Sequence, residues 1–217
     1  MRLIQIEVGT MQNFNYLVGC ETTGRAALVD PAWEVERMLD SARGAGLRVT
    51  DILITHTHPD HVEGLDRAFA ATGATIHVAA QEADRARQRL GGGAETAAIH
   101  EVADDVLIPV GDLPVRAMHT PGHTPGATCY RIPGGVITGD TLFIGRCGRV
   151  DFPGGDPEAM FSSLRRLAAL PGETVVYPGH NYADRPTSTI AREREHNIHM
   201  SAPDLKEFLR RRLGAVS

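Results

Sequence analysis

The residues best suited to chemistry crowd into one short run, Thr-His-Thr-His-Pro-Asp-His at positions 55–61, directly after an apolar stretch. Imidazole nitrogens bind zinc or iron, a carboxylate adds a harder oxygen ligand, and a metal held by such groups can activate water. We therefore predict a metal site at the end of a strand, in preference to a polar turn with surplus histidines. Its first ligand candidates are His56, His58, Asp60 and His61.

Three later segments each place a ligand-type side chain after a predicted strand. In the rigid Pro- and Gly-rich loop 119–126 we expect His123 to bind metal, and His119 to end the strand or support the ligands. Asp140 leaves a buried strand beside a glycine, where a cation must offset its desolvation, so we expect it to bridge two metals. His180 follows a Pro-Gly turn and completes the set. We predict structural or surface roles for His77, His100, His196 and His199.

The apolar pattern indicates the elements that must position these side chains. It predicts strands at 3–8, 14–18, 26–30, 49–54, 75–79, 115–118, 127–132, 135–138 and 174–177. It predicts helices at 34–42, 62–71, 81–90, 157–167, 187–195 and 203–213, and a flexible turn at the three glycines 91–93. Two halves of strands followed by helices favour two sheets packed face to face with helices outside.

Length and composition narrow the classes of protein. At 217 residues we expect a single domain, 1–217, and a net charge of −5 argues against a nucleic-acid-binding surface. The widely spaced Cys20, Cys129 and Cys147 form no Cys-x-x-Cys pair, which favours a reducing compartment. The chain shows neither a signal-peptide pattern nor a long apolar run, so we expect a cytoplasmic protein with no membrane contact.

The full series, His-x-His-x-Asp-His followed by a His, an Asp and a His, resembles the metallo-β-lactamase superfamily over nearly the whole chain. The resemblance implies an α/β fold of the αββα sandwich type, with the metals at one edge of two mixed sheets. It assigns a first metal to His56, His58 and His123, a second to Asp60, His61 and His180, and both to Asp140.

Two neighbouring segments narrow the resemblance. Residues 139–143, Gly-Asp-Thr-Leu-Phe, and 145–149, Gly-Arg-Cys-Gly-Arg, are similar to those of glyoxalase II (hydroxyacylglutathione hydrolase) and the persulfide dioxygenases. This implies a small thiol-derived substrate such as a glutathione derivative, contacted by Arg149 and Tyr182. The chain departs from larger glyoxalase II enzymes because only residues 181–217 follow His180, in place of a substantial helical domain.

The resemblance implies a thioester hydrolase with two divalent metal ions, zinc first, with iron or manganese as alternatives. The two cations would share a hydroxide, which Asp60 and Asp140 would orient as catalytic residues. The oligomeric state stays open.

The main alternative is a persulfide dioxygenase with one Fe(II), held by His56, His123 and Asp140. Pro59 stands where those dioxygenases commonly show Ala, which favours hydrolysis. Other superfamily activities, such as a lactonase, a β-lactamase or a tRNA-processing nuclease, fit the sequence less well, as does a noncatalytic metal-binding module.

Overall fold

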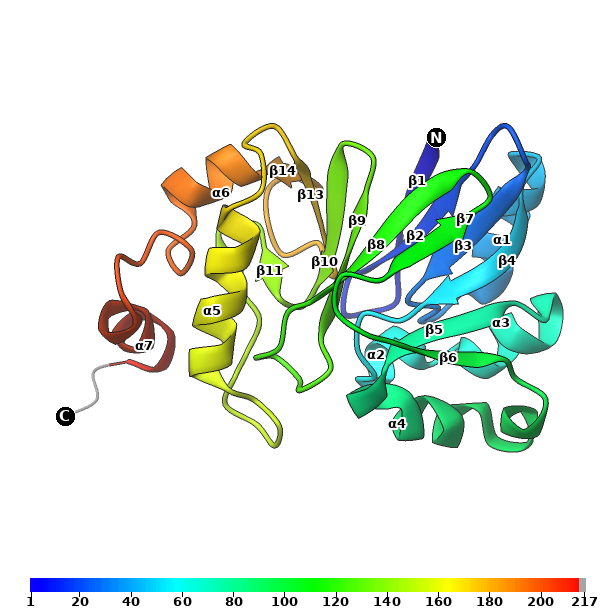
Figure 1. The fold of residues 1–217 in the computed structure, drawn as a ribbon, viewed down its shortest axis with the longest axis horizontal. Coiled ribbons are helices and arrows are strands. Elements are labelled where there is room, and N and C mark those ends of the chain that lie inside the picture. The colour runs from blue at the N-terminus through cyan, green and yellow to red at the C-terminus, as the bar shows by residue number, and fades with distance from the viewer. Residues whose placement is uncertain (215–217) are drawn as a thin grey trace.

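The computed structural model describes residues 1–214, in which two six-stranded sheets pack face to face (Figure 1). The first sheet has the order β1-β2-β3-β4-β5-β6. Its first three strands are antiparallel and the remaining pairs are parallel. Its strands are β1 (Arg2–Val8), β2 (Asn13–Gly19), β3 (Arg25–Val29), β4 (Arg48–Leu53), β5 (Thr75–Ala79) and β6 (Ile99–Val102).

The second sheet has the order β14-β13-β10-β9-β8-β7. Only the pair of β10 and β13 is parallel, so this sheet is mixed as well. Its strands are β7 (Leu107–Val110), β8 (Leu113–His119), β9 (Thr128–Ile132), β10 (Gly135–Gly139), β13 (Val175–Pro178) and β14 (Ser188–Thr189). A small hairpin follows β10 and consists of β11 (Leu142–Phe143) and β12 (Arg146–Cys147).

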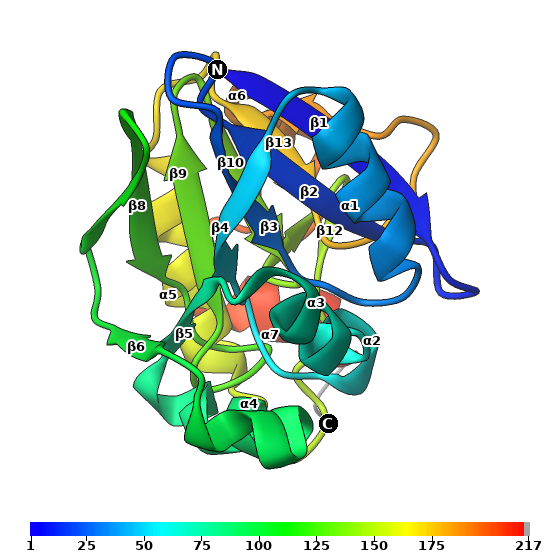
Figure 2. The same ribbon diagram turned by 90° about the vertical axis from the view of Figure 1, so that its right-hand side faces the viewer.

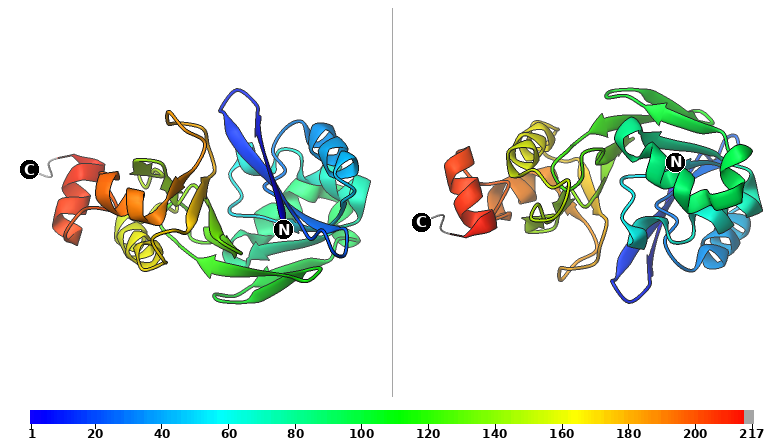
Figure 3. Two further views of the ribbon diagram at one scale, coloured as in Figure 1. Left: turned by 90° about the horizontal axis from the view of Figure 1, so that it is seen from above. Right: turned by 90° about the horizontal axis from the view of Figure 1, so that it is seen from below.

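Helices cover the outer face of each sheet, and the two groups lie on opposite sides of the sheet pair (Figures 1 and 3). The first sheet carries α1 (Val35–Gly44), α2 (Pro59–Val62), α3 (Leu65–Thr72), α4 (Ala80–Leu90) and the 3-10 turn η1 (Gly91–Glu95). Figure 2 looks onto this side of the molecule. The second sheet carries α5 (Pro157–Ala168), α6 (Ile190–His196) and α7 (Leu205–Leu213).

Side-chain alternation along the strands divides the core into three layers. Tyr16 and Val18 of β2 face the opposite sheet, where they join Tyr130 and Ile137. Leu17 points the other way, into the layer between the first sheet and its helices. Because successive residues of a strand face opposite sides, a strand buried on both faces is mostly apolar, as β2 is from Tyr16 to Val18. The expected αββα sandwich is therefore confirmed.

The structure also corrects parts of the expected element order. The predicted start of the helix at 62–71 is wrong. A short helix, α2, begins earlier at Pro59, and the helical backbone is interrupted at Gly64 before α3 begins. A Cβ at Gly64 would lie 2.5 Å from the carbonyl oxygen of Ala32, so the backbone passes too close for a side chain. Residues 91–93 lie in a 3-10 turn. The missed strands are short or polar: β6, β7, β11, β12 and β14.

Within residues 1–214, we found no helix with the length and apolar character that crossing a membrane requires.

Candidate metal centre

Three strand ends meet at one edge of the sandwich and carry the predicted ligands. His56 and His58 follow β4, Asp140 follows β10, and His180 follows β13. Pro59 occupies the first position of α2, which its fixed φ angle favours. The short helix turns the chain back, so that Asp60 and His61 face the same space as the preceding histidines. His123 comes from the loop between β8 and β9.

The ligand atoms form two groups. Those of His56, His58 and His123 lie within 4.8 Å of one another, and His58 Nδ1 is 2.9 Å from His123 Nε2. The other group, Asp60, His61 and His180, satisfies the same limit.

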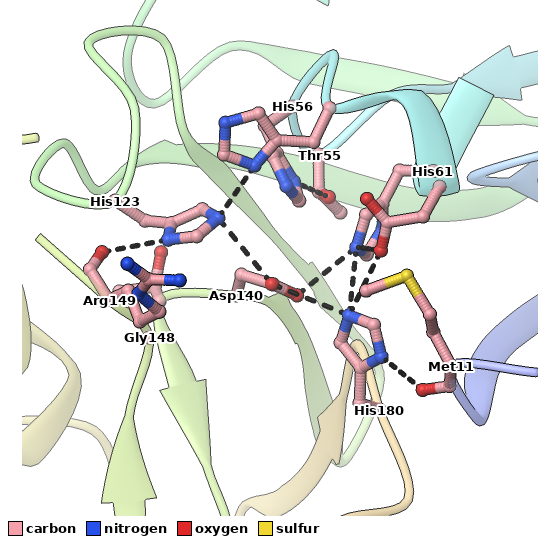
Figure 4. A network of polar contacts seen from close by, with 12 residues as sticks. Met11, Thr55, His56, His61, His123, Asp140, Gly148, Arg149 and His180 are labelled. Carbon is pink, nitrogen blue, oxygen red and sulfur yellow. Dashed lines mark hydrogen bonds and ion pairs between the residues drawn. The ribbon is translucent and has the colours of Figure 1, made fainter. Parts of the chain in front are cut away.

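Asp140 lies between the two groups, and Figure 4 shows its carboxylate pointing at histidines of both. Its Oδ1 is 3.2 Å from His61 Nε2, and its Oδ2 is 3.4 Å from His123 Nε2 and from His180 Nε2. A Cβ on Gly179 would lie 2.4 Å from Asp140 Oδ1, so the carboxylate needs a glycine beside it. All the predicted ligands thus come together, with Asp140 in the position expected of a bridge.

The donor set fits divalent metal ions. His56 Nε2 is buried and has no hydrogen-bond partner in the described part of the chain. Nitrogen atoms of neighbouring histidines approach closely, as for His61 Nε2 and His180 Nε2 at 3.2 Å. Lone pairs and carboxylate oxygens that face one another at such distances repel unless a cation or a proton lies between them. Imidazole and carboxylate groups together suit zinc, iron and manganese.

Hydrogen bonds on the outer nitrogens fix the orientation of the histidine rings (Figure 4). The Nδ1 of His123 donates to the carbonyl oxygen of Arg149 at 2.9 Å, and the Nδ1 of His180 donates to that of Met11 at 2.9 Å. Since a carbonyl oxygen only accepts, each Nδ1 carries a proton, and Nε2 presents a lone pair to the centre whenever the ring is neutral.

Asp30 is a supporting residue that the sequence analysis treated only as a strand end. Its carboxylate accepts from the backbone N–H of Thr55 at 2.7 Å and the Thr55 hydroxyl at 2.6 Å, and lies 3.0 Å from His61 Nδ1. The Thr55 hydroxyl in turn contacts His56 Nδ1 at 3.0 Å. One buried carboxylate thereby orients a histidine of each group. Asp30 adopts a left-handed φ of 49°, rare outside glycine.

Glu82 is a second residue that the sequence did not single out. Its side chain is 1% exposed and accepts from Thr57 and from the backbone N–H of Gly126 at 3.2 Å. Thr57 lies between His56 and His58, and Gly126 ends the loop of His123. Glu82 therefore ties together the two segments that carry the first ligand group. Because Glu82 lies on a helix of mostly charged, exposed residues, the sequence pattern predicts an exposed side chain and not this buried role.

The electrostatics of the centre keep most ligands in the metal-binding form. Burial and the neighbouring His123 lower the pKa of His58 to about 4, so its ring is neutral at neutral pH. Burial opposes ionisation of Asp140, but His61 and His180 hold its pKa well below the usual range. The pKa of His180 is raised to about 9, because its burial is outweighed by Asp140 and Asp60. The carboxylates thus favour positive charge at the centre.

The predicted substrate residues lie at the rim. The ring of Tyr182 stacks on His180 with centroids 4.6 Å apart, and 44% of this residue is exposed. The guanidinium of Arg149 pairs with both carboxylate oxygens of Asp151, at 2.9 and 3.1 Å, and lies 5.5 Å from the ring of Phe152. Tyr182 is therefore open to a ligand, whereas the charge of Arg149 is already matched.

The remaining histidines have other partners or are exposed. His119 Nε2 donates to the carbonyl oxygen of Pro125 at 3.0 Å, His77 pairs with Asp51 at 3.0 Å, and His199 Nδ1 accepts from the backbone N–H of Cys147 at 3.0 Å. His100 and His196 are exposed. These placements agree with the structural or surface roles expected of them.

Comparison with known proteins places this geometry in context. A family described as the metallo-β-lactamase superfamily matches residues 8–180. A hydroxyacylglutathione hydrolase from Fuscovulum blasticum is 38% identical over 174 residues, which cover 79% of this chain and 64% of that protein. The chain thus spans slightly less than two thirds of the length of this relative.

Two solved structures are also similar. ETHE1 from Myxococcus xanthus has a TM-score of 0.86 and 32% identity, covering 99% of this chain and 92% of that one. TTHA1623, solved in a di-iron-bound form, has a TM-score of 0.76 and 31% identity, covering 89% of this chain and 98% of that one.

Proposed function

The chain belongs to the metallo-β-lactamase superfamily, and from this premise we propose that it hydrolyses a thioester of glutathione or of a similar small thiol. The observation that carries the proposal is the position of Asp140 between two complete ligand groups. Two ion positions joined by one carboxylate suit hydrolysis, because bound ions would lower the pKa of the attacking water and polarise the carbonyl oxygen of the substrate. The relative from Fuscovulum blasticum supports the same substrate class.

His56, His58 and His123 would hold one divalent ion, and Asp60, His61 and His180 the other. When bound, such ions supply a Lewis acid for the carbonyl oxygen and lower the pKa of a water molecule to about 7. Asp60 and Asp140 face the same space between the groups, so their oxygens would orient the attacking water. Asn13 holds Asp60 in place by donating to its Oδ2 at 3.0 Å.

The leaving group needs little help from the protein. A thiol has a pKa of about 8.5, so a thiolate departs readily near neutral pH. Aromatic side chains lie around the ligand histidines. Phe152 packs edge-on against His58 and His123, at 5.1 and 5.0 Å between centroids, and Phe143 packs against Tyr182 at 5.5 Å. These rings would exclude water from the reacting carbonyl.

Tyr182 and Arg149 are our candidates for contact with the thiol half of the substrate. Tyr182 presents its ring and hydroxyl at the rim. To bind a carboxylate of the thiol, Arg149 would have to give up its ion pair with Asp151. This pair is exposed to solvent and is therefore weak.

The second candidate function is a persulfide dioxygenase with one iron, held by His56, His123 and Asp140. The likeness to ETHE1 over almost the full length of both chains favours it. In this alternative His58, Asp60 and His61 would not bind metal.

Asp60→Asn separates the two candidates, because Asp60 belongs only to the second ligand group. Hydrolysis of S-lactoylglutathione and oxygen uptake with glutathione persulfide are measured for both proteins. A thioester hydrolase loses at least a hundredfold of its rate in this variant. Oxygen uptake by the wild type that persists in Asp60→Asn, without hydrolysis, would establish the dioxygenase instead.

A further inference from the structure

A groove separates the metal-ligand loop from helix α4. Its cavity volume is about 410 Å³. We call it the α4 groove, and it is lined by Thr57, His58, Pro59, Val62, Arg85, Gln88 and Arg89. Because His58 belongs to the first ligand group, the groove begins beside the candidate metal centre. Figure 2 shows the two helices that contribute to its lining, α2 and α4.

Two arginines of α4 already have partners. Arg89 donates from Nε to the carbonyl oxygen of Val62 at 3.1 Å and pairs with Glu63 at 2.9 Å. It therefore links α4 to the end of α2 at one side of the groove. Arg87 lies outside the groove and pairs with Asp84 at 3.1 Å and Glu101 at 2.9 Å. The charges of both are matched within the protein.

Arg85 differs from these two. It is exposed at the groove, and among residues 1–214 it forms no ion pair or hydrogen bond. It lies three positions after Glu82, whose carboxylate contacts Thr57, so the Cα atoms of Glu82 and Arg85 are about 4.5 Å apart along the helix axis. Gln88 lies three positions beyond Arg85 on the same face of the helix and adds an amide to the rim.

We propose that the α4 groove is a subsite for a carboxylate of the substrate, which Arg85 binds. The subsite rests on the proposed function, since it assumes a thioester at the metal centre. Pro59 is exposed and offers apolar surface for a short methylene chain, and the planar guanidinium matches a carboxylate with two parallel hydrogen bonds.

The position of the groove indicates which half of the substrate it takes. Tyr182, proposed for the thiol half, stacks on His180 of the second ligand group, whereas the groove begins at His58 of the first group. The acyl half is therefore the part that extends toward Arg85. The preferred acyl group would derive from a dicarboxylic acid, with its free carboxylate at the far end of a short chain.

Binding of thioethers tests this subsite without any turnover, because a thioether cannot be hydrolysed. Three probes are titrated calorimetrically into the metal-loaded protein: S-(3-carboxypropyl)-N-acetylcysteamine, its neutral S-butyl counterpart, and S-butylglutathione. Wild type is compared with Arg85→Gln and with Arg87→Gln, a matched change on the same helix outside the groove. Melting temperatures should agree for wild type and Arg85→Gln, since Arg85 makes no contact that folding would lose.

We expect the carboxypropyl probe to bind about two- to fivefold more tightly than the butyl probe, as for one exposed ion pair. Arg85→Gln should remove this preference and Arg87→Gln should keep it. If Arg85→Gln instead weakens S-butylglutathione alone, Arg85 binds a carboxylate of the thiol half, and the proposed acyl subsite is wrong. Equal affinities in Arg85→Gln and wild type for all probes would overturn the proposal. These outcomes hold even if the wild type hydrolyses no thioester, which would count against the proposed function alone.

Discussion

Replacing Glu82 with glutamine should weaken metal binding at the first ligand group. The carboxylate of Glu82 accepts hydrogen bonds from both loops that carry His56, His58 and His123. A glutamine has the same shape but offers one acceptor oxygen and one N–H₂ donor. At least one backbone N–H, of Thr57 or of Gly126, must then lose its acceptor in a buried place.

The expected magnitude follows from these contacts. An unsatisfied buried donor, together with the lost charge on the acceptor, costs about 2 kcal/mol of unfolding free energy. For a chain of this length that lowers the melting temperature by roughly 4–8 °C. Outer partners that orient metal ligands are worth about 10- to 100-fold in metal affinity, and we expect a loss in this range at the first position.

The assay is a competition titration of zinc against a chelator, which gives separate affinities for the two metal-binding positions. Thermal unfolding is measured on the same samples. Asp51→Asn is the matched control. Asp51 is another buried carboxylate, 6% exposed, that bonds to His77 and Thr50 but to neither ligand loop. It should lose stability and keep both metal affinities. If Glu82→Gln loses stability but binds both ions as tightly as wild type, Glu82 does not position the ligands and the reasoning is wrong.

The other predictions concern the bridge, the rim and a buried histidine. Asp140→Ala should lose both bound metal and activity, and full metal content by elemental analysis would contradict the bridging role. Arg149→Ala should raise KM severalfold for a glutathione thioester at unchanged kcat and metal content; a change in kcat alone would argue against thiol binding. Burial and the nearby Arg212 lower the pKa of His199 to about 4, below the value of about 6.5 for an unfolded chain. Its neutral form therefore contributes stability above pH 6.5 that is lost as the pH falls toward 4. In denaturant unfolding, the stability advantage of wild type over His199→Asn should narrow over that range, and a constant difference would contradict it.

The sequence predicted which side chains come together, because several of the ligand candidates stand at or shortly after the end of a predicted strand. Strand ends at one sheet edge converge whatever the details of packing, so His56, Asp140 and His180 could be placed together from order alone. The strand 75–79 was predicted with the bounds that β5 has in the structure, since its β-branched residues Thr75, Ile76 and Val78 favour a strand.

The supporting residues could not be predicted in this way. Asp30 acts on residues 25 and 31 positions away, and Glu82 joins loops that lie 25 and 44 positions away. Such contacts depend on how α4 and the ends of β3 and β4 pack against one another. A local sequence pattern does not predict this packing. Arg85 is another such case, because whether an arginine has a partner depends on the tertiary structure.

The number of ions that activity requires tests the central claim most directly. Metal-depleted protein is titrated with zinc and with Fe(II), while S-lactoylglutathione hydrolysis and persulfide-dependent oxygen uptake are followed. We predict that hydrolysis rises in step with the second equivalent of metal and reaches its maximum at two ions per chain. Full oxygen uptake at one iron per chain, with no hydrolysis at any metal content, would contradict the account.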